Sequence, residues 1–187
     1  MQNKIGSIVA IEPSTGEILT LISSPTFNPN SLTGRKRSEN FNVILEDKNK
    51  PLFNRALLGQ YAPGSTFKLI NSLIALQEKS LNIYSSYNCI GGFEYAKDKI
   101  VRCHKHSSPL SLKKAIAISC NSYFCNVFQG FFDKFQNTEI AFNTWKEHIA
   151  SFGVGEWMNN DFTSGKKGLL PSTNTYDNIY GKTHWNA

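Results

Sequence analysis

QYAPGSTFKLINSLIAL, residues 60–76, is the most informative segment of the sequence. A Pro-Gly pair interrupts the chain there, and the apolar residues that follow are spaced as in a helix packed inside a domain. We therefore expect a helix over residues 65–79. On one face of this helix, Lys68 would lie one turn beyond Ser65, and Ser72 one turn beyond Lys68. The stretch thus predicts a polar stripe that contains a lysine on an otherwise apolar helix.

A lysine among apolar side chains has unusual chemistry. Loss of hydration disfavours the charged form and lowers the pKa of the amine. A neutral Lys68 could take the proton of the Ser65 hydroxyl, which is the Ser-Lys form of nucleophile activation. The helix start adds unpaired backbone N–H groups that favour an oxyanion. Two simpler roles stay open for these residues: Ser65 caps the helix, or Lys68 extends its charged head to water.

The Ser-x-x-Lys spacing is not specific by itself, since a chain of this length contains about one by chance. Only Ser65/Lys68 combines a Pro-Gly stop, a helix start and apolar surroundings. The two remaining pairs lie in the hydrophilic stretches SLKK and SGKK, where a lysine stays solvated and charged. These pairs are Ser111/Lys114 and Ser164/Lys167.

The composition is that of a globular protein. Of the 187 residues, 40% are hydrophobic and 12% aromatic, so one domain with a substantial core is expected. No run approaches the roughly 20 apolar residues of a membrane span, and no export signal is visible. The net charge of +6 comes from scattered basic residues without a nucleic-acid reading motif. We therefore expect no nucleic-acid partner.

Strands and helices are expected on both sides of the central stretch, so the sequence predicts an α+β fold. Alternating apolar residues before and after a Pro-Ser-Thr-Gly turn predict a β-hairpin over residues 5–22. The tail over residues 159–187 shows no convincing element. The remaining expected elements are a short helix near 41–45, strands near 93–95 and 100–102, and helices over 112–118, over 123–135 and from 143 or 144 to Gly153.

Two longer stretches resemble a known family. GSIVAIEPSTGEILTLISSPTFNPN (6–30), followed by PLFNRALLGQYAPGSTFK (51–68), is similar to the start of the transpeptidase domain of class B penicillin-binding proteins, and most to the penicillin-binding protein 2 or elongation subgroup. The resemblance extends to GLLPS and YDNIYGKTHWNA. It implies a β-lactamase/transpeptidase-like fold, an antiparallel sheet flanked by helices. Residues 1–187 would form a single partial domain, the first half of the whole.

The resemblance also assigns roles to four residues. Ser65 would be the nucleophile and Lys68 its general base. Ser119-Cys120-Asn121, at the expected break between two helices, would be the second motif: Ser119 relays a proton and Asn121 holds Lys68 or a substrate amide. Capping of the next helix by Ser119 or Asn121 is the alternative. Ser-x-Asn also occurs at Ser38, Ser80, Ser86 and Ser172.

The third motif of the family, Lys-Thr-Gly, is not recognised in this chain. Lys182-Thr183-His184 follows Ser119 by only about sixty residues, and it has histidine where close backbone approach requires glycine. The resemblance places the true motif further downstream. We therefore expect this chain to lack the closing strands, to expose an unpaired sheet edge, and to be weakly active or inactive alone.

Four cysteines complete the inventory of reactive side chains. Cys89, Cys103 and His106 suit a tetrahedral zinc site, while a Cys89–Cys103 disulfide or free thiols fit equally well. Cys120 and Cys125 are expected to be buried small side chains. Some elongation-type relatives carry zinc between the two catalytic motifs, with different ligands, so the resemblance is compatible with a structural zinc. No cofactor is expected for catalysis.

The function implied by the resemblance is that of a peptidoglycan DD-transpeptidase. Ser65 would attack the penultimate D-alanine of a stem peptide, and an amine of a neighbouring stem would resolve the acyl-enzyme. β-Lactams would acylate the same serine. The implied partners are stem peptides, β-lactams and, for the full-length protein, the elongation machinery at the periplasmic face of the bacterial inner membrane. A serine β-lactamase and a non-catalytic β-lactam sensor or binding module are the alternatives.

Overall fold

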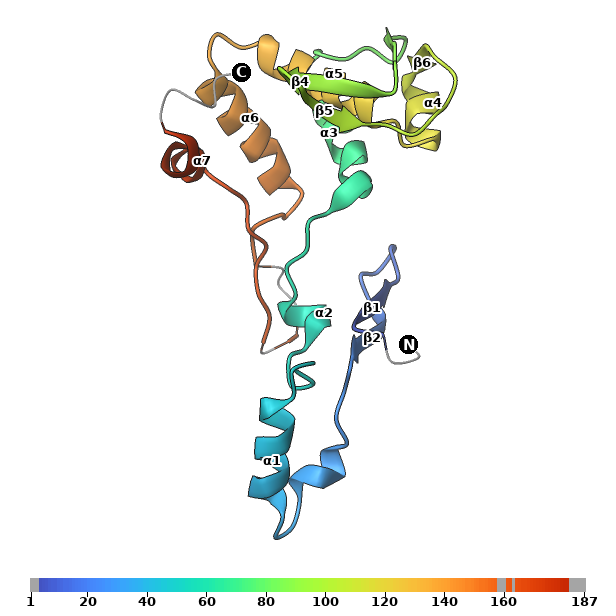
Figure 1. The fold of residues 1–187 in the computed structure, drawn as a ribbon. Helices are drawn as coiled ribbons and strands as arrows, with labels where there is room; N and C mark the ends of the chain where they lie inside the picture. Colours follow the sequence, from blue (N-terminus) through green and yellow to red (C-terminus); the bar gives the residue numbers. More distant parts are fainter. Residues whose placement is uncertain (1–3, 158–160, 163, 182–187) are drawn as a thin grey trace. The chain divides into compact units, whose positions relative to one another are not determined.

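The computed structural model describes residues 4–157, 161–162 and 164–181, which form two compact units (Figure 1). The first unit contains the described residues up to Tyr61 together with those of 157–167. The second unit contains 62–156 and the described residues from Gly168 onward. The assignment of 1–187 to a single partial domain stays a prediction. Lys182-Thr183-His184 lies outside the described residues.

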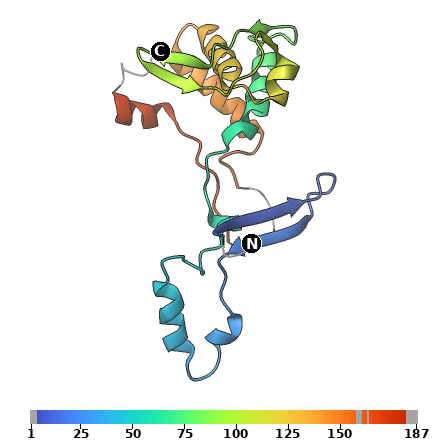
Figure 2. The ribbon, with the colours of Figure 1, turned by 45° about the vertical axis from the view of Figure 1, so that its right-hand side comes forward.

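The first unit begins with the predicted β-hairpin. β1 (Gly6–Ile11) and β2 (Ile18–Ser24) pair antiparallel, with Ile8 opposite Ile22 (Figure 2). The turn is closed by the Gly16 N–H, which donates to the Glu12 carbonyl at 2.8 Å. Gly16 has a φ of 80°, a conformation that glycine adopts without steric cost. The Pro-Ser-Thr-Gly signal therefore placed this turn correctly.

Three short helices follow in the first unit: a 3₁₀ turn (Pro29–Leu32), α1 (Arg37–Glu46) and α2 (Arg55–Leu58). α1 is longer than the helix expected near residues 41–45. α2 is capped by Asn54, whose Oδ1 accepts the N–H groups of Ala56 and Leu57. Buried Arg55 donates to the carbonyls of Asn49, Lys50 and Phe53. Its backbone N–H reaches Ser23 Oγ at 2.9 Å, which ties α2 to β2.

The second unit consists mainly of helices: a 3₁₀ turn (Gly64–Thr66) that leads into α3 (Phe67–Gln77), and α4 (Leu112–Ala117), α5 (Asn121–Asp133), α6 (Thr138–Ser151) and α7 (Thr173–Tyr180). The predicted start of α6 at 143 or 144 is wrong, because Asn137 Oδ1 accepts the Ile140 N–H and starts the helix earlier. The tail also contains an unpredicted helix. A capping box between Ser172 and Thr175 begins α7.

The strands of the second unit form two small antiparallel sheets. β3 (Ser86–Tyr87) pairs with β6 (Leu110–Ser111), and β4 (Gly92–Ala96) pairs with β5 (Lys99–Arg102). The β4–β5 hairpin lies where two short strands were predicted. A Cβ atom at Gly92 would lie 2.6 Å from Ile100 Cγ2, so this position requires glycine.

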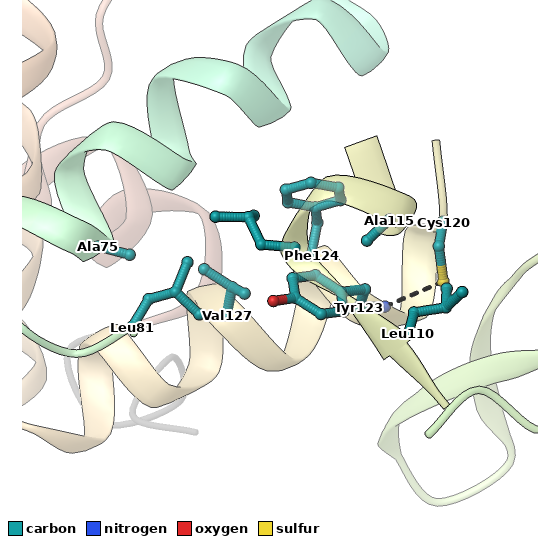
Figure 3. Packing of buried hydrophobic residues seen from close by; sticks show 9 residues of the cluster. Ala75, Leu81, Leu110, Ala115, Cys120, Tyr123, Phe124 and Val127 are labelled. Carbon is teal, nitrogen blue, oxygen red and sulfur yellow. Dashed lines mark hydrogen bonds between the residues drawn. The ribbon is translucent and has the colours of Figure 1, made fainter. Parts of the chain in front are cut away.

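The core of the second unit is built around α5. Tyr123, Phe124 and Val127 are buried, and they pack with Ala75 of α3 and with Leu110 of β6 (Figure 3). A second cluster joins the same helices to α6 and contains Ile74, Phe131, Ala141 and Ile149. These contacts hold α3 beside α5. The beginning of each helix carries one of the two motifs, so the packing decides whether the motifs meet.

Candidate active site

Lys68 is the centre of the candidate site, because its amine lies between residues of the second motif. Lys68 Nζ donates to Asn121 Oδ1 at 2.6 Å, to the Ser119 carbonyl at 2.8 Å and to Ser119 Oγ at 3.0 Å. Lys68 is on the first turn of α3, and Ser119 and Asn121 lie between α4 and α5. The structure therefore brings together residues more than 50 positions apart in the sequence.

The turn between α4 and α5 depends on an uncommon backbone conformation. Ser119 has a φ of 55°, in the left-handed region that non-glycine residues rarely adopt. The N–H groups of Ser119 and Cys120 donate to the carbonyls of Ile116 and Ala115 and end α4. Cys120 then caps α5, since its Sγ accepts the Tyr123 N–H at 3.3 Å (Figure 3). The side-chain cap is thus Cys120, and not Ser119 or Asn121.

Ser65 and Lys68 both line a pocket of about 210 Å³, while the hydrogen-bond partners of Lys68 Nζ among the described residues are Ser119 and Asn121. Ser65 is exposed and belongs to the 3₁₀ turn that precedes α3, one turn before Lys68. Ser72 does not join this site: it is buried, and its hydroxyl donates to the Lys68 carbonyl at 2.8 Å. The pocket is lined by Ser65, Thr66, Lys68, Leu69, Ile116, Ser119 and Phe124.

Burial acts against the charged form of Lys68. It lowers the pKa of the Lys68 amine below its usual 10.5, and the negative charge of the neighbouring Cys103 sulfur opposes that effect only in part. The Phe124 ring forms part of this environment, with its centroid 5.5 Å from Nζ. A lysine with a lowered pKa that shares a pocket with a serine is a candidate general base.

The expected zinc ligands lie together, and a fourth residue joins them. The ligand atoms of Cys89, Cys103, His106 and Cys120 all lie within 4.8 Å of one another. Cys103 Sγ is 3.4 Å from His106 Nε2 and 3.7 Å from Cys120 Sγ. Cys120 was expected only as a buried small side chain, although a Cys-x-x-His pair flanked by two further cysteines could have indicated it. All four cysteines are free thiols, and Cys125 lies outside the cluster.

The thiols of the cluster differ in acidity. Burial raises the pKa of Cys103, but hydrogen bonds from His106, from the backbone N–H groups of Ser122 and Asn121 and from Cys120 outweigh it and lower that pKa to about 6. Burial raises the pKa of Cys120 to about 12. The hydrogen bond to the Ser107 carbonyl, followed by the one with Cys103, raises the pKa of His106. Cys103 is thus the most acidic thiol of the cluster, and a thiolate is the form of cysteine that binds metal ions.

Comparisons with known proteins identify the family. The family model of the penicillin binding protein transpeptidase domain matches residues 6–184. Peptidoglycan D,D-transpeptidase MrdA of Acinetobacter baumannii is 30% identical over 174 residues, which cover 89% of this chain and 24% of MrdA. The chain thus spans about a quarter of the length of this curated relative.

Solved structures agree with the family assignment. Pseudomonas aeruginosa PBP2 has 26% sequence identity and a TM-score of 0.79, over 98% of this chain and 40% of that one. Helicobacter pylori PBP2, solved in complex with MreC, shares the fold with a TM-score of 0.80 at 23% identity, over 99% of this chain and 33% of that one. The fold is the α+β fold of these transpeptidase domains, present in part. The chain belongs to the penicillin-binding protein transpeptidase family.

Proposed function

We propose that this chain is the part of a peptidoglycan D,D-transpeptidase that carries the nucleophile Ser65. The observation that supports this best is the position of Lys68 Nζ, which shares a pocket with Ser65 and hydrogen bonds with Ser119 and Asn121. The name of the MrdA relative supports the substrate class, the stem peptides of peptidoglycan. The family name supports β-lactams as acylating inhibitors of the same serine.

The first step transfers an acyl group to the serine. Ser65 Oγ attacks the carbonyl carbon of the penultimate D-alanine while the neutral Lys68 amine takes the hydroxyl proton. The carbonyl oxygen becomes an oxyanion, which the Ser65 backbone N–H at the helix start stabilises, and one such donor contributes about 2.7 to 4 kcal/mol. The C–N bond then breaks. The leaving D-alanine takes its proton from Lys68 through the Ser119 hydroxyl.

The second step forms the cross-link and regenerates the enzyme. An amine of a neighbouring stem attacks the acyl carbon, loses a proton toward the Ser119–Lys68 pair, and displaces Ser65 Oγ, which recovers its hydrogen. Asn121 keeps Lys68 in place through the 2.6 Å contact with Nζ. No metal or organic cofactor takes part in these steps.

Within this function, the cysteine cluster is proposed to hold a structural zinc ion. Three sulfurs and one imidazole are a usual tetrahedral zinc set. Two sulfurs bound to one zinc at about 2.3 Å lie about 3.8 Å apart at the tetrahedral angle. The 3.7 Å between Cys103 Sγ and Cys120 Sγ fits this geometry. Metal analysis of protein purified without chelator tests the site, and less than about a tenth of an equivalent of zinc contradicts it.

The whole protein is proposed to act with the cell-wall elongation machinery at the periplasmic face of the inner membrane. The complex of Helicobacter pylori PBP2 with MreC supports this partnership. Within the described ranges of the chain, every helix is too short or too polar to cross a membrane.

Labelling with a fluorescent penicillin tests the proposal. The protein to use is an extended version, in which the chain continues at its C-terminus through the Lys-Thr-Gly strand. We expect stoichiometric labelling that Ser65→Ala abolishes and that Ser111→Ala, in another Ser-x-x-Lys pair, leaves intact. Release of D-alanine from a stem pentapeptide identifies a transpeptidase. Rapid turnover of the penicillin identifies a β-lactamase, and labelling without any turnover identifies a sensor module.

A further inference from the structure

Asn121 is held at three points, and two of them come from the end of β5. Its side-chain Nδ2 donates to the Arg102 carbonyl at 2.9 Å, and its backbone N–H donates to Cys103 Sγ at 3.3 Å. The remaining side-chain atom, Oδ1, accepts from Lys68 Nζ at 2.6 Å. Both ends of the amide are therefore engaged, one by β5 and the other by the proposed general base.

This arrangement fixes which way the amide faces. If the amide turned over, its NH₂ group would face the Lys68 amine and its oxygen would face the Arg102 carbonyl. Two donors would then oppose each other whenever Lys68 is protonated, and two acceptor oxygens would oppose each other in either state of Lys68. The Arg102 carbonyl therefore selects the orientation in which Asn121 accepts from Lys68, and the Cys103 sulfur holds the backbone from which the side chain extends.

The end of β5 is itself anchored. The Cys103 N–H donates to the Gly91 carbonyl at 2.9 Å, and Arg102 pairs with Gly92 across the hairpin. Gly91 has a φ of 99°, and Gly92 has no room for a Cβ atom. Gly92 thus allows β4 to approach β5 closely, and Gly91 takes a backbone conformation that favours glycine where its carbonyl accepts the Cys103 N–H.

We propose that Arg102–Cys103 at the end of β5 positions Asn121, and through it Lys68, for acylation of Ser65. This inference rests on the proposed function and adds a role for the β4–β5 hairpin, which belongs to neither motif. Cys103 is a positioning residue, since it acts through Asn121. Its effect on Asn121 differs from any effect of zinc, because Cys89 and His106 make no hydrogen bond to Asn121 among the described residues.

That difference provides matched variants for a test in the extended version. Cys89→Ala and Cys103→Ala each remove one zinc ligand, but only Cys103→Ala removes the acceptor of the Asn121 N–H. Gly92→Ala displaces β5 without removing a ligand, and Gly130→Ala is its control, since a Cβ atom there has open space in α5. Cys125→Ala is the control for cysteine replacement outside the cluster. For each variant, stopped-flow labelling with penicillin separates the acylation rate constant from the affinity of the non-covalent complex.

We expect Cys103→Ala to be acylated about 10- to 100-fold more slowly than Cys89→Ala. We expect the same difference between Gly92→Ala and Gly130→Ala. A small displacement of a catalytic group has effects of this size. The affinity of the non-covalent penicillin complex stays within about twofold of that of the unsubstituted protein, because these variants keep the Asn121 side chain. Cys103→Ser, whose hydroxyl accepts the same N–H, recovers part of the rate. Cys125→Ala acylates like the unsubstituted protein. Equal rates for Cys103→Ala and Cys89→Ala overturn the inference.

A second measurement does not depend on activity. In a ¹⁵N-labelled sample, the side-chain amide signal of Asn121 is assigned by its loss in Asn121→Asp. We expect this signal to shift in Cys103→Ala and Gly92→Ala, and to keep its position in Gly130→Ala. An unshifted signal in both of the first two variants overturns the inference. If the unsubstituted protein is not acylated at all, the proposed function fails, while the amide signal still decides whether β5 positions Asn121.

Discussion

Among single residues, Lys68 sets the pH at which the proposed site reacts. Only its neutral amine can accept the Ser65 proton, so the acylation rate constant rises with pH as the amine loses its proton. Because burial lowers the pKa of this amine, the rise is centred below 10.5, the value of an ordinary lysine. The measurement is the acylation rate constant for penicillin as a function of pH.

Lys68→Arg is the control for this pH profile. A guanidinium stays protonated at all accessible pH values, so the variant is acylated far more slowly and without the rise. A profile of the unsubstituted protein centred at or above 10.5 would contradict the proposed role of Lys68.

Ser119 combines a reactive hydroxyl with an unusual backbone, and two substitutions separate these properties. Both Ser119→Ala and Ser119→Gly remove the Oγ that lies 3.0 Å from Lys68, so both lower the acylation rate about 100- to 10,000-fold. Glycine suits the φ of 55°, whereas alanine does not. We expect the glycine variant to be more stable than the alanine variant by about 1 kcal/mol, measured by urea unfolding. Equal stability of the two variants would show that the turn carries no strain.

The residues of the site were predictable to different degrees. Ser65 and Lys68 stood out because an apolar helix rarely carries a lysine. Ser119 and Asn121, in contrast, were predicted from the family resemblance, which placed the second motif at a break between two helices. The Ser119 carbonyl and the β5 residues that hold Asn121 were not predictable. These contacts depend on backbone direction at a left-handed residue and on the end of a strand, and no side-chain pattern encodes either of them.

Among the helices, Glu78 joins the C-terminal end of α3 to α5 and α6. Its carboxylate lies 2.8 Å from His148 Nε2 and 3.3 Å from Lys134 Nζ, and Lys134 also donates to its carbonyl. The hydrogen bond with His148, and then the interactions with Lys134, lower the pKa of Glu78 below its usual 4.5. The contribution to stability is therefore complete above pH 4.5 and is lost as the pH falls through the folded-state pKa.

Replacing this carboxylate tests the connection between the helices. We expect Glu78→Gln to lower the free energy of unfolding at neutral pH by about 1 kcal/mol and to weaken its decrease in acid. Urea unfolding at about pH 3 and pH 7 measures both effects. Glu147→Gln changes an exposed carboxylate on α6 and leaves stability nearly constant. A similar pH dependence in Glu78→Gln and the unsubstituted protein would exclude this role of Glu78.

The helices and strands show where sequence patterns succeed and fail. The β1–β2 hairpin and α5 were predicted correctly because a turn signal and a long apolar period define them. The start of α6 and the whole of α7 were missed. Both depend on side-chain caps, at Asn137 and at Ser172 with Thr175, that act before any apolar period begins.

In the whole molecule, the β1–β2 hairpin exposes aliphatic side chains on both faces. Ile8 and Val9 are neighbours that point to opposite faces, and they are 48% and 43% exposed. Leu19 is 65% exposed. A two-stranded sheet with apolar residues on both faces is marginal in water. We expect the Lys-Thr-Gly strand of the extended version to cover this hairpin.

Comparison of the 187-residue chain with the extended version tests this expectation. The 187-residue chain should bind a hydrophobic dye such as ANS, because the apolar surface of the hairpin is open to water. It should also show fast amide exchange at the outer edges of β1 and β2, where the β1–β2 pairing does not protect the N–H groups. The extended version should bind less dye, protect these amides and react with penicillin at Ser65. The resemblance to the family implies that the third motif supplies an oxyanion donor and a cation for the substrate carboxylate, which would account for that gain. Stoichiometric penicillin labelling of the 187-residue chain, with β1 and β2 already protected, would show that these residues need no further strand.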